Sequence, residues 1–151
     1  MATELSHEEE EIFGLGKEVE FPACIGGDGF CFHRCVWFIT GNVPGFPEWS
    51  TYDGHIRGYL EANRGVLRWD NPLFEATQAT QVYPLECVAG LAEGTYLIQL
   101  IDRQCVTGHW AALVGAGIFD PGAGRKDIPV VDWIRIFRNR FGVRRLFPVV
   151  L

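Results

Sequence analysis

Three residues whose side chains together support nucleophilic catalysis occur along the chain: Cys31, His109 and Asp120. A cysteine attacks as its thiolate, and a helix N-terminus favours that charge through its unpaired N–H groups and dipole. The thiolate also needs a histidine as base, and the base needs an acceptor that fixes its orientation. These residue types therefore predict a Cys-His-Asp triad.

Cys31 stands where a glycine-containing segment, residues 22–30, meets an apolar stretch, residues 31–39. That stretch is apolar almost all round, as in a buried helix, although its composition alone also allows a buried strand. The N-cap Asp28 and the stop at Gly41 favour the helix. The preceding loop can aim backbone N–H groups at a developing oxyanion. We expect this oxyanion and substrate loop to comprise Gly27, Asp28, Gly29 and Phe30.

His109 is the best placed of four histidines, because it opens an apolar strand where a sheet edge can meet a helix N-terminus. His7 lies in a terminal segment that we expect to fray, His33 points away from Cys31 on a helix, and His55 has no evident partner. The neighbouring Trp110 is predicted to line the substrate cleft and to shield the base from water, with core packing as the alternative.

Asp120 can reach His109 only if the hairpin between them has a two-residue turn at 115–116. Asp120 then lies opposite Ala111, on the same face of the sheet as His109, because side chains alternate with period two. Diagonal neighbours of this kind are about 7–8 Å apart at the backbone. A three-residue turn would place Asp120 on the other face.

The elements that must position these residues follow from the hydrophobic pattern. Helices are predicted first and antiparallel strands second, which indicates a single α+β domain with segregated layers. Residues 1–20 form an acidic tail or short helix that begins with a capping box from Ser6 to Glu9, and residues 21–151 form the domain. Further helices are expected at 52–62 and from Asn71, strands at 95–101 and 144–151, and a hairpin of strands at 109–114 and 118–119. Residues 128–137 fit either type.

Composition excludes several classes. A chain of 151 residues that is 48% hydrophobic can build a core, and it has no apolar run long enough to span a membrane. A net charge of −6 argues against nucleic-acid binding. Seven basic residues gather at 125–145, and seven glutamates at 1–20. The Arg135–Arg145 surface either binds a partner or meets the acidic segment.

Five cysteines and no secretory signal indicate a reducing cytoplasm rather than a disulfide framework; this would be a host cytoplasm for a viral or effector protein. Cys24, Cys31, His33 and Cys35 raise the alternative of a zinc site, but His33 would point away from Cys31 and Cys35 on a helix. We therefore expect no metal and no cofactor. Taken singly, each triad residue also has a structural alternative: a buried thiol, a packed histidine and a turn aspartate.

The motifs resemble those of the papain-like cysteine peptidase superfamily. Residues 27–34 are similar to the Asp-Gly-Asn-Cys motif of ovarian-tumour-type deubiquitinases, with Phe30 where Asn or Ser is usual. Residues 109–121 are similar to the peptidase domains that trim bacteriocin leaders, and viral leader proteases share the same minimal pattern. Because no Gln precedes Cys31, the resemblance implies that the backbone amides of Gly29, Phe30 and Cys31 bind the oxyanion.

The resemblance implies a papain-like fold, with a central helix carrying Cys31 packed on an antiparallel sheet carrying His109 and Asp120. The expected function is hydrolysis of a peptide or isopeptide bond through an acyl-enzyme, with a protein or peptide substrate, ubiquitin-like proteins among them. Two alternatives stay open: deamidation or acyl transfer on the same scaffold, and a non-enzymatic effector or inhibitor that binds a protein partner.

Overall fold

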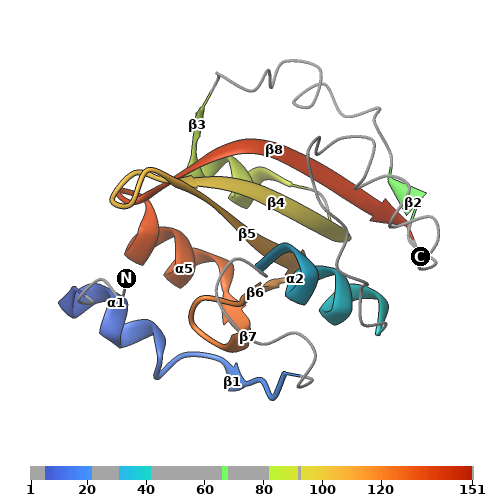
Figure 1. Cartoon of the computed structure of the whole chain (residues 1–151), viewed down its shortest axis with the longest axis horizontal. Helices are drawn as coiled ribbons and strands as arrows, with labels where there is room; N and C mark the ends of the chain where they lie inside the picture. The colour runs from blue at the N-terminus through green and yellow to red at the C-terminus, as the bar shows by residue number, and fades with distance from the viewer. Residues whose placement is uncertain (1–5, 22–30, 42–65, 68–81, 92, 151) are drawn as a thin grey trace.

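The computed structural model describes residues 6–21, 31–41, 66–67, 82–91 and 93–150 (Figure 1). The predicted N-cap Asp28, the rest of the loop 27–30 and the helices expected at 52–62 and from Asn71 lie outside the described residues.

An antiparallel sheet of eight strands forms the body of the described structure (Figure 1). Its order is β1-β7-β6-β5-β4-β8-β2, and β3 also pairs with β8. The expected strand at 95–101, the 109–119 hairpin and the last strand are confirmed. In chain order the strands are β1 (Lys17–Glu18), β2 (Val66–Leu67), β3 (Tyr83–Pro84), β4 (Thr95–Asp102), β5 (Thr107–Val114), β6 (Gly117–Asp120), β7 (Arg125–Pro129) and β8 (Phe141–Val150).

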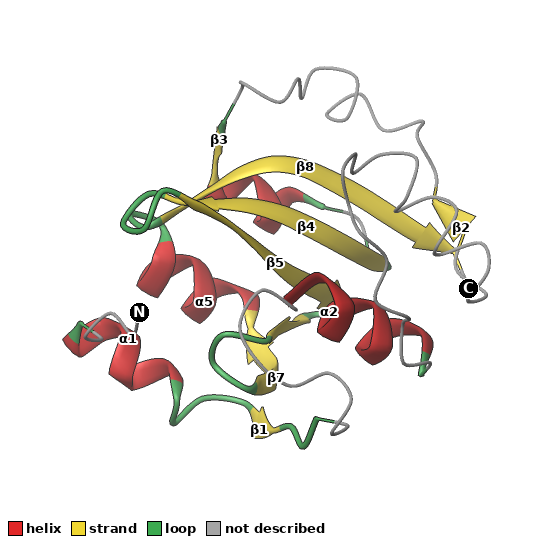
Figure 2. Ribbon diagram, in the orientation of Figure 1, coloured by secondary structure: helices red, strands yellow, loops and turns green. Residues whose placement is uncertain are grey.

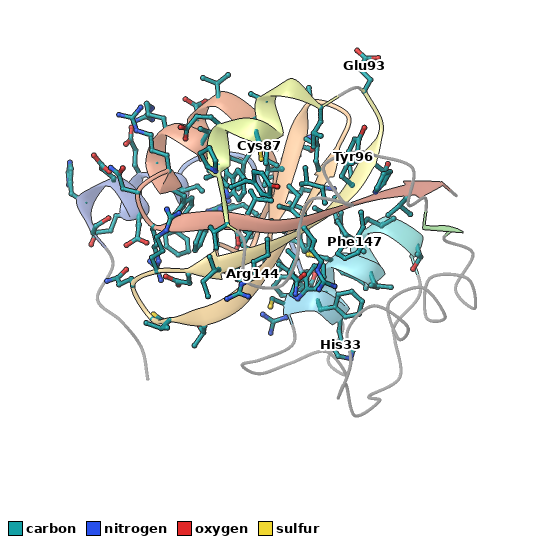
Figure 3. The ribbon with its side chains drawn as sticks, turned by 90° about the horizontal axis from the view of Figure 1, so that it is seen from above. His33, Cys87, Glu93, Tyr96, Arg144 and Phe147 are labelled. Atoms are coloured by element: carbon teal, nitrogen blue, oxygen red, sulfur yellow. The ribbon has the colours of Figure 1, made fainter. Side chains whose placement is uncertain are left out.

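Helices cover both faces of this sheet (Figure 2). Helix α2 (Cys31–Thr40) packs on β5, while the 3₁₀ helix η2 (Leu85–Gly90) contacts β8 and helix α5 (Val130–Phe137). Figure 3 shows α2 and η2 on opposite sides of β4 and β8. A mixed α+β fold with an antiparallel sheet is thus confirmed.

The ambiguous segment 128–137 contains both types of structure: β7 ends at Pro129, and α5 begins at Val130. Side chains in α5 are buried with helical spacing, whereas Val131 is 74% exposed. The order of helices first and strands second therefore fails here, because α5 lies between the last two strands.

The N-terminal helix α1 (His7–Ile12) opens with the predicted capping box. The Glu9 backbone N–H donates to Ser6 Oγ over 3.1 Å, and the Ser6 N–H donates to Glu9 Oε1 over 3.0 Å. The expectation that this segment frays is wrong, because Ile12 is 1% exposed and Glu9 forms an ion pair with Arg140. Helix α1 contacts α5 and belongs to the folded domain.

Candidate active site

The β5–β6 hairpin has the two-residue turn that the triad requires. Val114 pairs with Gly117, and Gly115 in the turn has φ +63°. Side-chain alternation from this turn brings Asp120 to the face of the sheet that carries His109.

Strands β5 and β6 pair only as far as Ala112 and Phe119. Beyond this point β5 continues along β4, where His109 pairs with Leu100, and β6 continues along β7, where Asp120 pairs with Arg125. The His109 and Asp120 side chains meet where β5 and β6 separate, and His109 Nε2 lies 2.9 Å from Asp120 Oδ1.

Asp120 is almost completely buried and holds three hydrogen-bond partners. Besides His109, the Trp133 indole N–H donates to Oδ2 and the Gly122 backbone N–H donates to Oδ1, each over 2.9 Å. Burial alone would raise the pKa of this carboxyl, but His109 and the two donors hold the pKa below its usual value. Asp120 therefore stays ionised beside the imidazole.

His109 joins Asp120 to Cys31. Its Nε2 faces Asp120, and the Cys31 side chain is close enough to act on the pKa of the same ring. Burial acts to lower the pKa of His109, but Asp120 and Cys31 outweigh it and raise the pKa to about 10. The ring also stacks on Phe141 at a centroid distance of 5.0 Å. The imidazolium is thus held in one orientation.

Cys31 is the first residue of α2 and is half-buried. Aromatic contacts fix the helix on the sheet: Phe32 packs edge-on against Trp110 at 4.9 Å, and Phe38 stacks on Phe119 at 4.2 Å. The structure therefore brings Cys31, His109 and Asp120 together, while the loop 27–30 lies outside the described residues.

Trp110, predicted to line the cleft, lies in the core. It is 5% exposed, and its ring packs against Phe32 and against Phe147, the latter at 5.9 Å. This is the packing alternative, and it gives Trp110 a part in supporting the helix that carries Cys31.

The other candidate zinc ligands are buried in α2. Burial raises the pKa of Cys35 well above its usual value and lowers the pKa of His33. Within the described residues, no group of three His, Cys, Asp or Glu side chains could hold a metal ion, and Cys24 is not among these residues.

The basic segment is partly neutralised by the acidic one. Arg135 lies 3.4 Å from Glu11 and 3.8 Å from Asp132, and Arg140 is paired with Glu9 and Asp102. The alternative that the two segments meet is thereby confirmed at Arg135 and Arg140. A partner for the Arg135–Arg145 surface stays a prediction.

Trp133 and Gly122 are site residues that sequence reasoning missed. Trp133 falls in the segment of ambiguous type, so no local pattern connects it with Asp120. Gly122 belongs to an Asp-Pro-Gly turn signal, which suggested only a turn. No signal in a single sequence could have found the Trp133 contact.

We expect Gly122→Ala to slow alkylation of Cys31 by roughly tenfold, since small misplacements of catalytic groups are costly. An added Cβ would lie 3.2 Å from both His109 Cε1 and Asp120 Oδ1 and would push the pair apart. Iodoacetamide labelling with peptide mapping measures the rate. Gly90→Ala is the matched control, because a Cβ there meets nothing within 4 Å. Equal rates in both variants would contradict a positioning role.

Stability should depend on pH through His109. Folded His109 keeps its proton to about pH 10, whereas the unfolded residue loses it near 6.5. The stabilisation that protonated His109 gives the folded state is complete below pH 6.5 and disappears as pH rises through the pKa of folded His109. The free energy of unfolding should therefore fall by up to ~1.4 kcal/mol per pH unit.

Urea unfolding of Cys31→Ser between about pH 6.5 and 8 tests this in a protein that lacks the Cys31 thiol. Without Cys31, the pKa of folded His109 is raised less. The pH range over which the free energy of unfolding falls therefore ends at a lower pH. Adding Asp120→Asn should remove most of the slope, because it removes the charge that raises the His109 pKa. The same slope in both proteins would show that other groups cause it.

No described helix is long and apolar enough to cross a membrane. Comparisons of the chain with protein-family models, with curated proteins and with solved structures find no match. The candidate active site thus rests on the geometry of Cys31, His109 and Asp120.

Proposed function

We propose that this protein is a thiol hydrolase with a papain-like arrangement, which cleaves a peptide or isopeptide bond in a protein or peptide substrate of the cytoplasm. Cys31 is the nucleophile, His109 the general acid and base, and Asp120 the residue that orients His109. One observation carries the proposal: His109 Nε2 lies 2.9 Å from Asp120 Oδ1, and Cys31 at the start of α2 is close enough to raise the pKa of the same imidazole.

The reaction has two steps. The Cys31 thiolate attacks the substrate carbonyl carbon, and the tetrahedral intermediate collapses when the C–N bond breaks. His109 gives its proton to the leaving amine, and a thioester with Cys31 remains. Water then attacks this thioester and gives one proton to His109. The C–S bond breaks, so a carboxylic acid product leaves and the thiolate–imidazolium pair is restored.

The helix and the sheet each contribute to this chemistry. The N-terminus of α2 stabilises the thiolate and, with the loop before it, is proposed to bind the oxyanion. Asp120 stays charged and stabilises the imidazolium that forms at His109. Trp133 and Gly122 hold the carboxylate by donating to its two oxygens.

Cys105 provides an internal reference for testing the nucleophile. Cys105 is exposed, whereas Cys31 is half-buried, so access alone predicts faster alkylation at Cys105. A thiolate at Cys31 predicts the reverse at about pH 6, where ordinary thiols are protonated. We expect iodoacetamide to label Cys31 at least ~10 times faster than Cys105. Faster labelling of Cys105 would overturn the proposal.

A further inference from the structure

A cavity of about 200 Å³ lies directly against the His109–Asp120 pair. The pair forms one wall together with Gly122, and α1 contributes to another. Charged side chains lie in a third part, where Glu9, Asp102 and Arg140 meet. The apolar lining consists of Ile12, Phe13, Ala123, Phe137 and Phe141.

The charged groups of this cavity already have partners. The Arg140 Nε donates to Asp102 Oδ1 over 3.1 Å and Nη2 to Asp102 Oδ2 over 2.9 Å, while Nη1 meets Glu9 Oε2. The remaining Glu9 oxygen accepts from the Ser6 N–H. Because these charges satisfy one another, they give a charged ligand little to bind.

The apolar groups form a continuous wall beside the imidazole. Phe141 stacks on His109 at 5.0 Å and on Phe137 at 4.7 Å. Phe13, which is 38% exposed, and the exposed Gly122 both line the cavity, so part of its lining is open to solvent. An apolar cavity of about 150 Å³ can hold benzene. The space here therefore suits one aromatic or branched apolar side chain.

The chemistry of His109 fixes which part of a substrate reaches this cavity. This step rests on the proposed function, in which His109 protonates the departing amine. His109 lines the cavity and Cys31 does not, so the side chain next to the departing amine can reach the cavity past His109. We propose that the cavity binds the apolar side chain of the substrate residue that follows the scissile bond.

An acetyl group on Cys31 allows this subsite to be tested without a known substrate. p-Nitrophenyl acetate acetylates a reactive thiolate, and its leaving group takes the His109 proton and departs as nitrophenol, which ionises in solution. An added amine then attacks the thioester carbonyl, the C–S bond breaks, and the amine leaves as an N-acetyl amide after giving a proton to His109. This reverses the proposed departure step, so the amine occupies the leaving-group position.

We expect phenylalaninamide and leucinamide to capture the acetyl group roughly tenfold better than glycinamide or lysinamide. Rates are normalised to aminolysis of a simple thioester without protein, and products are identified by mass spectrometry. Acetylation of Cys31 without this preference would overturn the subsite and leave the hydrolase proposal standing. Absence of acetylation at Cys31 would overturn both.

Two variants locate the preference in the cavity. Ala123→Leu places a larger side chain in the space and should reduce the preference for phenylalaninamide to near that for glycinamide. Ala116→Leu makes the same change at the exposed hairpin turn and should retain the preference. Phe13→Ala removes a ring from the cavity lining at a residue that is already exposed. This variant therefore tests the cavity even if Ala123→Leu does not fold. An unchanged preference in Phe13→Ala and in folded Ala123→Leu would overturn the assignment.

Discussion

Replacing Asp120 with asparagine is expected to slow alkylation of Cys31 at about pH 6 by at least ~100-fold, within the range of acid–base contributions. The carboxylate accepts from His109, Trp133 and Gly122 at once. An asparagine amide has one oxygen, so its NH₂ group must face one of these donors. It also lacks the charge that holds the imidazolium beside Cys31.

The same substitution should reduce stability by about 1–3 kcal/mol, because one buried donor is left unsatisfied. Urea unfolding measures this loss, and near-ultraviolet circular dichroism checks that the fold persists. Asp132→Asn is the matched control, since Asp132 lies in α5 and pairs only with Arg135 among the contacts described. If folded Asp120→Asn were alkylated within threefold of the unmodified protein, about 0.7 kcal/mol in the barrier, Asp120 would have no orienting role.

Replacing His109 with alanine is expected to have the other large effect, a loss of roughly 100- to 1,000-fold in Cys31 alkylation at about pH 6. Without the imidazolium, the thiolate loses its paired charge and its hydrogen bond. Labelling should then rise with pH as it does for an ordinary thiol, and Cys31 should lose its advantage over Cys105.

Added imidazole should restore part of the lost reactivity of His109→Ala, since the substitution leaves a space beside Phe141 and Asp120. Rescue separates a chemical role from structural damage, because a collapsed site would not respond to imidazole. His7→Ala is the control: His7 is exposed in α1 and should label as the unmodified protein does. A pH profile that His109→Ala left unchanged would exclude His109 as the base.

Local signals predicted the parts of the site that lie close in sequence. The Ser6–Glu9 capping box depends on residues three apart, and the 115–116 turn sets the register between His109 and Asp120 through simple alternation. Both are confirmed by the structure. Apolar runs likewise located α2 and the central strands, and the cap signals at Asp28 and Gly41 decided for a helix at 31–39.

Other features depend on contacts between distant segments. Trp133 reaches Asp120 because α5 packs near β6, which no local pattern encodes. The sequence left open whether Trp110 lines the cleft or packs in the core, for a related reason. Strand alternation places Trp110 on the opposite face of β5 from His109, but only the packing of α2 shows that this face is buried. The same limit applies to the basic segment, where Arg135 and Arg140 find the partners Glu11 and Glu9 in the distant α1.

The Arg140 cluster has a consequence for hydrogen exchange. Helix α1 has only six residues, too few to be stable alone, so its amides are protected by the attachment of Glu9 to Arg140, which Asp102 also holds. Exchange at Ile12 should therefore report how often α1 detaches, and each detachment removes a wall from the space beside His109. Deuterium uptake in this short helix would then measure how often the proposed apolar subsite opens.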